Sequence, residues 1–251
     1  NSVFNGSTAV SLFFILSGLV LSFKYIKSDA PTSYSEFIIK RGFRIYPAFW
    51  IVLFLSFIMV DNSLSIQEIL QDASLLIKAK QELVPPAWSL VIEMQMSILF
   101  LFLLVIARKN LILLFVCVGI FYSLFGLTFF TFHFCVGILI ASKIEEIQKI
   151  QIPIVLRYCL FILGWVFASF NELHLILFSK AANLGTWLSL FELFGCSLWL
   201  LLVISAPNFQ KKLSIKPLVF FGEISYGLYI GHWLIWTHIV NPYFDFFVEI
   251  A

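Results

Sequence analysis

Residues 110–142 read NLILLFVCVGIFYSLFGLTFFTFHFCVGILIAS, a stretch without one charged side chain. An α-helix needs roughly 20 mostly apolar residues to cross the hydrocarbon core of a bilayer. The stretch is therefore long for one membrane-spanning helix and short for two. We predict two helices with a break near Gly126, and this choice decides which side of the membrane each later segment faces.

The rest of the chain is also strongly apolar. Of its 251 residues, 61% are hydrophobic, 18% are aromatic and only 12% are charged, with a mean hydropathy of +1.00. Soluble domains carry about 25% charged residues, so this chain has too few to cover a globule in water. The composition excludes a soluble enzyme, a secreted disulfide scaffold and a disordered tail. A net charge of +2 gives no reason to expect nucleic acid as a partner.

The sequence predicts an all-α fold, a polytopic membrane helical bundle with about eight transmembrane helices. The predicted spans are 7–25, 44–60, 86–107, 110–126, 128–142, 153–171, 183–206 and 217–241. Since no repeat of fixed period is present, residues 1–251 are expected to form a single integral membrane domain. The four cysteines lie within apolar runs and are expected to be core residues, and no metal site is predicted.

Lysines and arginines divide 13 to 3 between the two sides of the membrane when eight spans are assumed. The larger group comprises Lys24, Lys27, Lys40, Arg41, Arg44, Arg108, Lys109, Lys143, Lys149, Arg157, Lys211, Lys212 and Lys216. The smaller group comprises Lys78, Lys80 and Lys180. Cytoplasmic loops carry the excess of Lys and Arg, so the larger group is expected in the cytoplasm. A single span over 110–142 would place the later clusters of Lys and Arg on the opposite side of the membrane and remove this bias.

The same alternation of sides places residue 1 outside the cytoplasm. The chain opens Asn1-Ser2-Val3, with no initiator Met, no basic n-region and no cleavable signal. We therefore expect an N-terminally truncated chain that has lost at least one preceding span.

A cluster of cations stands at the predicted inner end of the second span, in Arg41-Gly-Phe-Arg44-Ile-Tyr-Pro47, with Lys40 beside it. Arg41 and Arg44 are three residues apart and share a helix face. Two guanidinium groups on one face are suited to bind phosphates bidentately. The alternative is ordinary anchoring at the membrane interface by snorkelling side chains.

Two carboxylates fall inside predicted spans, where an ionisable residue is costly unless it faces protein or water. Glu93 ends the stretch Trp88-Ser89-Leu-Val-Ile-Glu93 and lies roughly 10 Å below the outer interface. A buried carboxylate there can accept a proton or orient a histidine. The alternative for Glu93 is a polar tie between helices, and this is the favoured interpretation of Glu192.

Ser225, Tyr229 and His232 form a polar stripe on one face of the last span, at positions i, i+4 and i+7. We expect this stripe to face the bundle interior, either as part of a site or as satisfied hydrogen-bonding groups. The other histidines, His133, His174 and His238, are expected to be structural or interfacial. A small-residue stripe in the first span, formed by Ser7, Ser11, Gly18 and Ser22, is expected to permit close helix packing.

These motifs together resemble the acyltransferase 3 family of integral-membrane O-acyltransferases and O-acetylases. They occur in the family's order and cover nearly the whole chain. The matching stretches are Ala9-Val-Ser-Leu-Phe-Phe-Ile-Leu-Ser-Gly18, Arg41-Gly-Phe-Arg44-Ile-Tyr-Pro47, Trp88-Ser-Leu-Val-Ile-Glu93 and Gly222-Glu-Ile-Ser-Tyr-Gly-Leu-Tyr229 followed by His232.

The resemblance implies acyl transfer, commonly of acetyl, from cytoplasmic acyl-coenzyme A to a hydroxyl of a cell-surface carbohydrate, a lipid-linked glycan or a related acceptor. It implies a multi-pass protein of a bacterial inner membrane, with acyl-CoA as a co-substrate and no tightly bound cofactor. By this resemblance, the family's upstream histidine is expected to precede residue 1, and His232 is followed by Trp233 where many relatives have a proline soon after. The implied site comprises catalytic Glu93 and His232, the coenzyme A-binding Lys40, Arg41 and Arg44, and the pocket residues Trp88, Ser89, Ser225, Tyr226 and Tyr229.

Two other functions stay open at the level of the sequence. A transporter or flippase of a lipid-linked sugar would also use polar residues at membrane depth, although such proteins often contain inverted repeats. A catalytically inactive membrane interaction protein is the other alternative.

The cation bias predicts a topology that labelling can test. Segments 26–40, 107–110, 143–152 and 207–216 should face the cytoplasm, with 61–85 and 172–182 outside. A membrane-impermeant maleimide added to intact cells should label a cysteine placed at Gln71 and spare one placed at Lys212. The reverse pattern would invert the topology.

Overall fold

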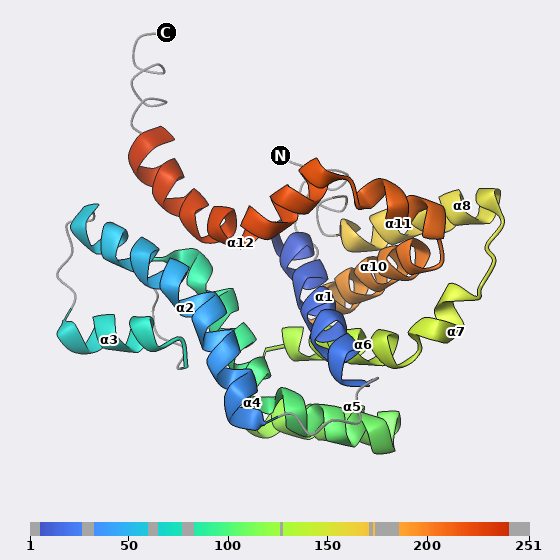
Figure 1. Ribbon diagram of the computed structural model, residues 1–251, viewed down its shortest axis with the longest axis horizontal. Helices are drawn as coiled ribbons and strands as arrows, with labels where there is room; N and C mark the ends of the chain where they lie inside the picture. Colours follow the sequence, from blue (N-terminus) through green and yellow to red (C-terminus); the bar gives the residue numbers. More distant parts are fainter. Residues whose placement is uncertain are drawn as a thin grey trace, which may run out of the picture. The chain divides into compact units, whose positions relative to one another are not determined.

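The computed structural model describes residues 6–26, 33–59, 65–76, 83–125, 128–170, 173 and 186–240, and every regular element in these ranges is a helix (Figure 1). This confirms the predicted all-α class. The chain forms two compact units. The first comprises residues 1–30 and 100–213, and the second comprises residues 31–99 and 214–251.

Each of the eight predicted spans contains a helix. These helices are α1 (Gly6–Ile26), α2 (Tyr34–Met59), α4 (Trp88–Lys109), α5 (Leu111–Phe125), α6 (Phe130–Ser142), α8 (Ile154–Ala168), α10 (Thr186–Ile204) and α12 (Lys216–Ile235). Shorter elements are α3 (Ile66–Ser74), η1 (Pro85–Ala87), α7 (Ile144–Gln148), α11 (Pro207–Leu213) and the π-helix η2 (Trp236–Val240).

The predicted count of about eight membrane spans is not confirmed. Among the described residues, four helices are long and apolar enough to cross a membrane, or up to five if the bent pair α10–α11 counts as one span. Helices α5, α6 and α8 have 15, 13 and 15 residues, fewer than the roughly 20 that a bilayer requires. The chain therefore combines full-length apolar helices with shorter ones.

The predicted break within 110–142 is confirmed, because α5 ends at Phe125 and α6 begins at Phe130. Gly126 itself lies outside the described residues. The helix of the second predicted span, 44–60, begins before that span, because α2 begins at Tyr34. A helix can continue past the hydrocarbon core and can carry a charge whose partner lies on a neighbouring helix.

Close helix crossings hold the first unit together. A Cβ atom added to Gly18 on α1 would lie 2.0 Å from the carbonyl oxygen of Phe134 on α6. Gly137 on α6 faces Ile15 of α1 in the same way, with 2.1 Å to its carbonyl oxygen. These contacts bring the two backbones together, as small residues allow in membrane helices. The packing role expected of Gly18 is therefore confirmed.

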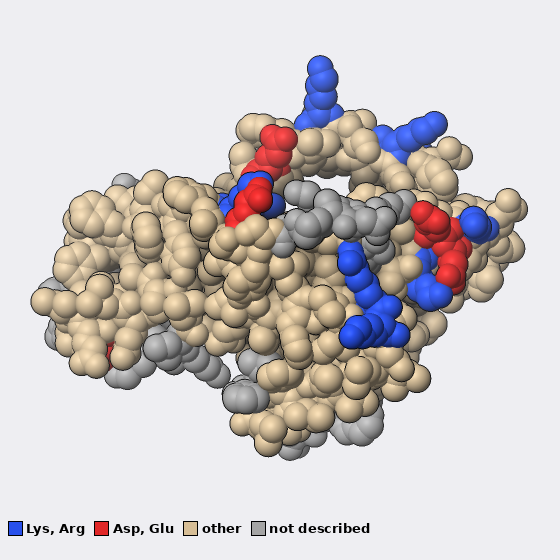
Figure 2. Space-filling model, turned by 60° about the horizontal axis from the view of Figure 1, so that its bottom comes forward, with Lys and Arg blue, Asp and Glu red and all other residues tan. Residues whose placement is uncertain are grey.

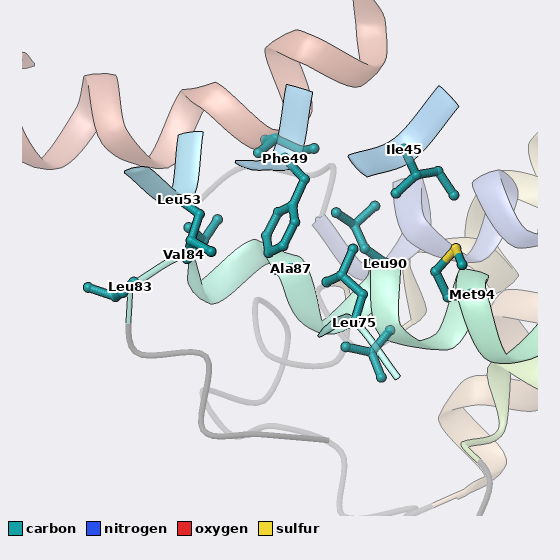
Figure 3. Packing of buried hydrophobic residues seen from close by; sticks show 11 residues of the cluster. Ile45, Phe49, Leu53, Leu75, Leu83, Val84, Ala87, Leu90 and Met94 are labelled. Carbon is teal, nitrogen blue, oxygen red and sulfur yellow. The ribbon is translucent and has the colours of Figure 1, made fainter. Parts of the chain in front are cut away.

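Helices α2, α3 and α12 form the second unit with η1 and the part of α4 up to Leu99. Buried side chains of α2 at Ile45, Phe49 and Leu53 point toward η1 and α4, where Ala87 and Leu90 meet them (Figure 3). Among the described parts of this unit, α12 has a single side chain in the buried cluster, Ile230.

Charged side chains are sparse on the surface. On the face drawn in Figure 2 they form a few small groups, and the rest of the surface formed by described residues is uncharged. Large apolar side chains are exposed along several helices, for example Phe54 at 62% and Phe221 at 58%. Such a surface suits contact with lipid, because soluble monomers rarely expose apolar patches of this extent.

The α1–α6 crossing predicts a stability difference between glycines. Gly137→Ala should lower the free energy of unfolding by about 1–3 kcal/mol, because the new methyl group overlaps a backbone oxygen that cannot move aside. The matched control is Gly119→Ala on α5, where no atom lies within 4 Å of the new methyl group. Thermal unfolding in detergent measures both, and equal stabilities would show that the close crossing is absent.

Candidate functional site

Arg41 and Glu93 form a buried ion pair between α2 and α4. Arg41 Nη2 lies 2.7 Å from Glu93 Oε1, and Arg41 Nε donates to Ser97 Oγ at 3.2 Å. Arg41 is 7% exposed and Glu93 is 5% exposed. The two stretches that the sequence analysis treated as separate sites therefore meet at one point.

The register of α2 explains why Arg41 faces α4. Buried residues of this helix recur about every fourth position, at Phe37, Arg41, Ile45, Phe49 and Leu53. Residues four apart lie on the same side of a helix, so Arg41 belongs to the apolar face that packs on α4. On α4, Leu90 and Met94 flank Glu93 in the same buried face.

Pairing is what makes both charges tolerable at this depth. The interaction between opposite charges is strong where water is excluded, but it has to offset a large cost of removing both ions from water. The Ser97 hydroxyl adds a hydrogen-bond acceptor for Arg41 and donates to the carbonyl oxygen of Glu93 at 2.7 Å. Glu93 Oε2 accepts no hydrogen bond from the described residues, so one carboxylate oxygen is available to another donor.

The expected phosphate clamp of Arg41 with Arg44 is not present. Arg41 is buried and bound to Glu93, whereas Arg44 is exposed and makes no hydrogen bond to a residue that the structure describes. Arg44 lies beside the buried face of α2, which continues through Ile45, and its side chain is exposed. Lys40 is also exposed and pairs with Glu36 one turn earlier on α2.

Hydroxyl groups connect α12 to the start of α4 and to α2. Tyr229 Oη lies 2.9 Å from Ser89 Oγ and donates to the carbonyl oxygen of Pro86 at 3.2 Å. Tyr226 Oη donates to the carbonyl oxygen of Ile45 at 2.7 Å. Both tyrosines are half-buried, and Ser89 is 1% exposed. Trp88 is 36% exposed at the first position of α4.

The predicted inward stripe of Ser225, Tyr229 and His232 is wrong for two of its three members. Ser225 is exposed and donates to the carbonyl oxygen of Gly222, and exposed His232 interacts through Nδ1 with the carbonyl oxygen of Tyr229. The face of α12 that packs within its unit contains Tyr226, Tyr229 and Ile230. The spacing of Ser225, Tyr229 and His232 predicts a polar stripe along α12. The side of α12 that packs against the rest of its unit instead includes Tyr226 and Ile230.

Other polar residues of the spans have structural partners in the first unit. Ser7 and Ser11 on α1 donate to the carboxylate of Glu192 on α10 at 2.6 and 2.9 Å, as a tie between helices. His133 is fully buried; its Nδ1 lies 3.4 Å from the carbonyl oxygen of Phe129, and its Nε2 has no partner. His174 lies outside the described residues, and His238 is half-buried in η2.

Sequence reasoning missed Ser97 and the partner of Arg41. The every-fourth-residue pattern from Phe37 to Leu53 was the available signal, since it places Arg41 among apolar residues that face another helix. A serine four residues after Glu93 would then have been the natural hydroxyl beside the pair.

Comparison with known proteins gives one family. The family model of the acyltransferase domain, acyltransferase 3, matches residues 1–249. No curated protein and no solved structure matches the chain.

The ion pair predicts strong coupling between two substitutions. Arg41→Met should lower the free energy of unfolding by about 3–5 kcal/mol, because it leaves a carboxylate buried without its cation. The double variant Arg41→Met/Glu93→Met should recover most of that loss. Unfolding in detergent of Arg41→Met, Glu93→Met and the double variant measures the coupling, with exposed Arg44→Met as the control, expected to change stability by less than about 0.5 kcal/mol. Additive losses in the double variant would mean that the two side chains do not interact.

Proposed function

The chain belongs to the acyltransferase 3 family, and we propose that it transfers an acyl group, with acetyl the expected one, from acyl-coenzyme A to a hydroxyl of a carbohydrate or lipid-linked glycan. The hydroxyl oxygen attacks the thioester carbonyl carbon, the carbon–sulfur bond breaks, and the hydroxyl proton ends on the coenzyme A thiol. The products are an ester and free coenzyme A.

The buried pair of Arg41 with Glu93 is the observation that carries this proposal. A hydroxyl is a weak nucleophile, and a positioned base that removes its proton during attack accelerates the reaction. Glu93 Oε1 is fixed by Arg41, while no described residue donates to Oε2. In the proposal, Oε2 accepts the hydroxyl proton or orients the histidine that accepts it.

Arg41 acts as a positioning residue in this proposal. Its planar guanidinium always carries a charge and holds one carboxylate oxygen in a fixed direction. Ser97 fixes the guanidinium in turn through Nε. The same contacts keep Arg41 from serving as a phosphate ligand.

Arg44 and Lys40 remain the proposed ligands of the coenzyme A phosphates. Both are exposed near the beginning of α2, which the cation bias assigns to the cytoplasm. Arg44 makes no hydrogen bond within the described part of the chain, so its guanidinium is available for a phosphate. The surface pair of Lys40 with Glu36 is weak enough for a phosphate to compete with it.

Ser89, Tyr226 and Tyr229 are proposed to line the pocket together with Trp88. The hydroxyl groups of Ser89 and Tyr229 join α12 to the first turn of α4, one turn before Glu93, and that of Tyr226 joins α12 to α2. Ser225 and His232 are not retained, because their side chains are exposed. Long apolar helices and the family support a multi-pass membrane protein. We propose a bacterial inner membrane as its location.

Glu93→Gln tests the proposed role of the carboxylate. The amide keeps the shape of the side chain but cannot accept the proton, so turnover should fall by roughly 10²-fold or more. Acyl-CoA binding should persist. The assay follows thioester consumption by the intact protein in membranes, which a transporter or an inactive protein would not catalyse. Glu192→Gln is the matched control and should retain turnover, and wild-type turnover in Glu93→Gln would reduce Glu93 to a structural tie.

Arg44→Ala tests the proposed donor site separately. Loss of a charge-assisted hydrogen bond should weaken acyl-CoA binding by at least about 1.5 kcal/mol while the fold stays intact. Arg44→Lys should restore part of the affinity, because an ammonium lacks the planar fork of the guanidinium. Calorimetric titration with acyl-CoA gives these affinities, with Lys212→Ala as the control on the same predicted side. Unchanged affinity would return Arg44 to membrane anchoring.

A further inference from the structure

Helix α10 ends in a bend that turns the chain through 98° into the seven-residue helix α11 (Figure 1). The 19 residues of α10 extend about 28 Å, close to the thickness of the hydrocarbon core of a bilayer. A helix turned through this angle adds little to the depth that α10 spans. With α10 along the membrane normal, α11 lies nearly parallel to the membrane plane, at one face of the bilayer.

Side chains fix this bend at the carbonyl oxygens that end α10. The last four carbonyl oxygens of a helix have no partner within the helix. Gln210 Nε2 of α11 donates to the carbonyl oxygens of Val203 at 3.1 Å and Ile204 at 2.8 Å. Arg157 Nη1 of α8 donates to that of Leu202 at 2.7 Å. Donors from two neighbouring helices therefore satisfy three of these oxygens, and they hold α11 at its angle to α10.

Apolar and cationic side chains lie on opposite sides of α11. At about 100° per residue, six side chains fall into two arcs of about 100° each. One arc contains Phe209, Gln210 and Leu213, and the opposite arc contains Asn208, Lys211 and Lys212. Because Gln210 reaches the end of α10, its arc faces the membrane. Phe209 and Leu213, 48% and 42% exposed, lie on this membrane side.

The opposite side of α11 carries positive charge that the described residues do not offset. Lys211 and Lys212 are exposed and make no ion pair or hydrogen bond with the part of the chain that the structure describes. Exposed Lys143, by contrast, pairs with Glu146 at 2.7 Å. The cation bias assigns this end of α10 to the cytoplasm, where anionic lipids give the membrane surface a negative potential. The chemistry of α11 therefore matches that surface in both its apolar and its charged side.

We propose that α11 is an amphipathic interfacial helix that binds the headgroups of anionic phospholipids. Lys211 and Lys212 contact the lipid phosphates, while Phe209 and Leu213 enter the boundary between headgroups and acyl chains. The fixed bend orders α11 before any lipid binds, so little conformational freedom is lost on binding. The proposal does not depend on acyl transfer, because its residues take no part in the proposed reaction and its tests need no turnover.

Lipid titration of the intact protein in detergent tests the charged side. Phosphatidylglycerol should raise the Tm more than phosphatidylcholine does, because a ligand that binds only the folded state stabilises it. Lys211→Gln/Lys212→Gln should raise the half-maximal phosphatidylglycerol concentration by roughly tenfold or more, since each lysine near an anionic surface contributes about fivefold. Lys143→Gln removes a lysine that is already paired with Glu146, and this matched control should titrate like the wild type.

Photocrosslinking tests the membrane side without reference to stability. The intact protein in nanodiscs that contain phosphatidylglycerol carries p-benzoylphenylalanine at Phe209 or, as the matched control, at Asn208. Position 209 should crosslink to phospholipid, and position 208, on the opposite arc, should do so at least about threefold less. Equal yields from the two positions would show that α11 has no fixed orientation. Crosslinks from position 209 to a second copy of the chain would show that protein covers this side, and either result would overturn the proposal.

A soluble phosphate compound is the other source of the same headgroup chemistry. Coenzyme A and inorganic phosphate, titrated in place of lipid, should change the Tm of the wild type and of the double lysine variant equally. A stabilisation by coenzyme A that the double variant loses would make α11 a site for soluble phosphates instead. Equal phosphatidylglycerol titrations of the wild type, the double variant and Lys143→Gln would also refute lipid binding by α11.

Discussion

A charge inside a membrane-spanning helix has to find an opposite charge, and the pairing of Arg41 with Glu93 is the constraint on which the second unit depends. The pair sets the register between α2 and α4, because any slide that separates the two groups leaves both buried and unpaired. The apolar contacts from Ile45 to Leu53 then follow from that register (Figure 3). Hydrophobic packing alone would not fix it, since lipid solvates a leucine as well as a neighbouring helix does.

A buried ion pair is a poor way to gain stability, since apolar residues of similar size often stabilise a fold as well. Its cost therefore points to a use, and the geometry suggests which one. One carboxylate oxygen is held by Arg41, and the other accepts nothing from the described residues. An arrangement that fixes a base while leaving one of its oxygens open is what a reaction at a hydroxyl requires. A purely structural tie saturates its acceptors, as Glu192 does with hydroxyls on both carboxylate oxygens.

The sequence predicted the all-helical class, a helix in each apolar stretch and the break between α5 and α6. These features follow from the lengths of the apolar stretches and the positions of the charged residues, which a membrane constrains directly. It singled out Glu93 for the same reason. It did not reveal the partner of Glu93, since Arg41 next to other cations has the composition of an interfacial anchor. It placed Ser225 and His232 inward by spacing alone, whereas the packing side of α12 is decided by contacts with α2 and η1. The span count is not confirmed for α5, α6 and α8, where the apolar composition is present without the length.

Arg41 and Arg44, three residues apart on α2, have different environments. Arg41 lies on the buried face of α2 and is committed to a carboxylate, while the side chain of Arg44 is exposed and has no such commitment. In the proposed function, one guanidinium cannot both hold Glu93 and bind a phosphate, so the two tasks fall to two residues of one helix. A rotation of α2 that moves Arg44 also moves Arg41, so donor binding at Arg44 would be linked to the position of Glu93. Tyr226 of α12 donates to the carbonyl oxygen of Ile45, and Tyr46 and Trp50 donate to carbonyl oxygens of α3, so two helices hold the same stretch of α2 against such a rotation. In the proposed function, the same helix therefore carries both the donor ligand Arg44 and the residue that positions Glu93.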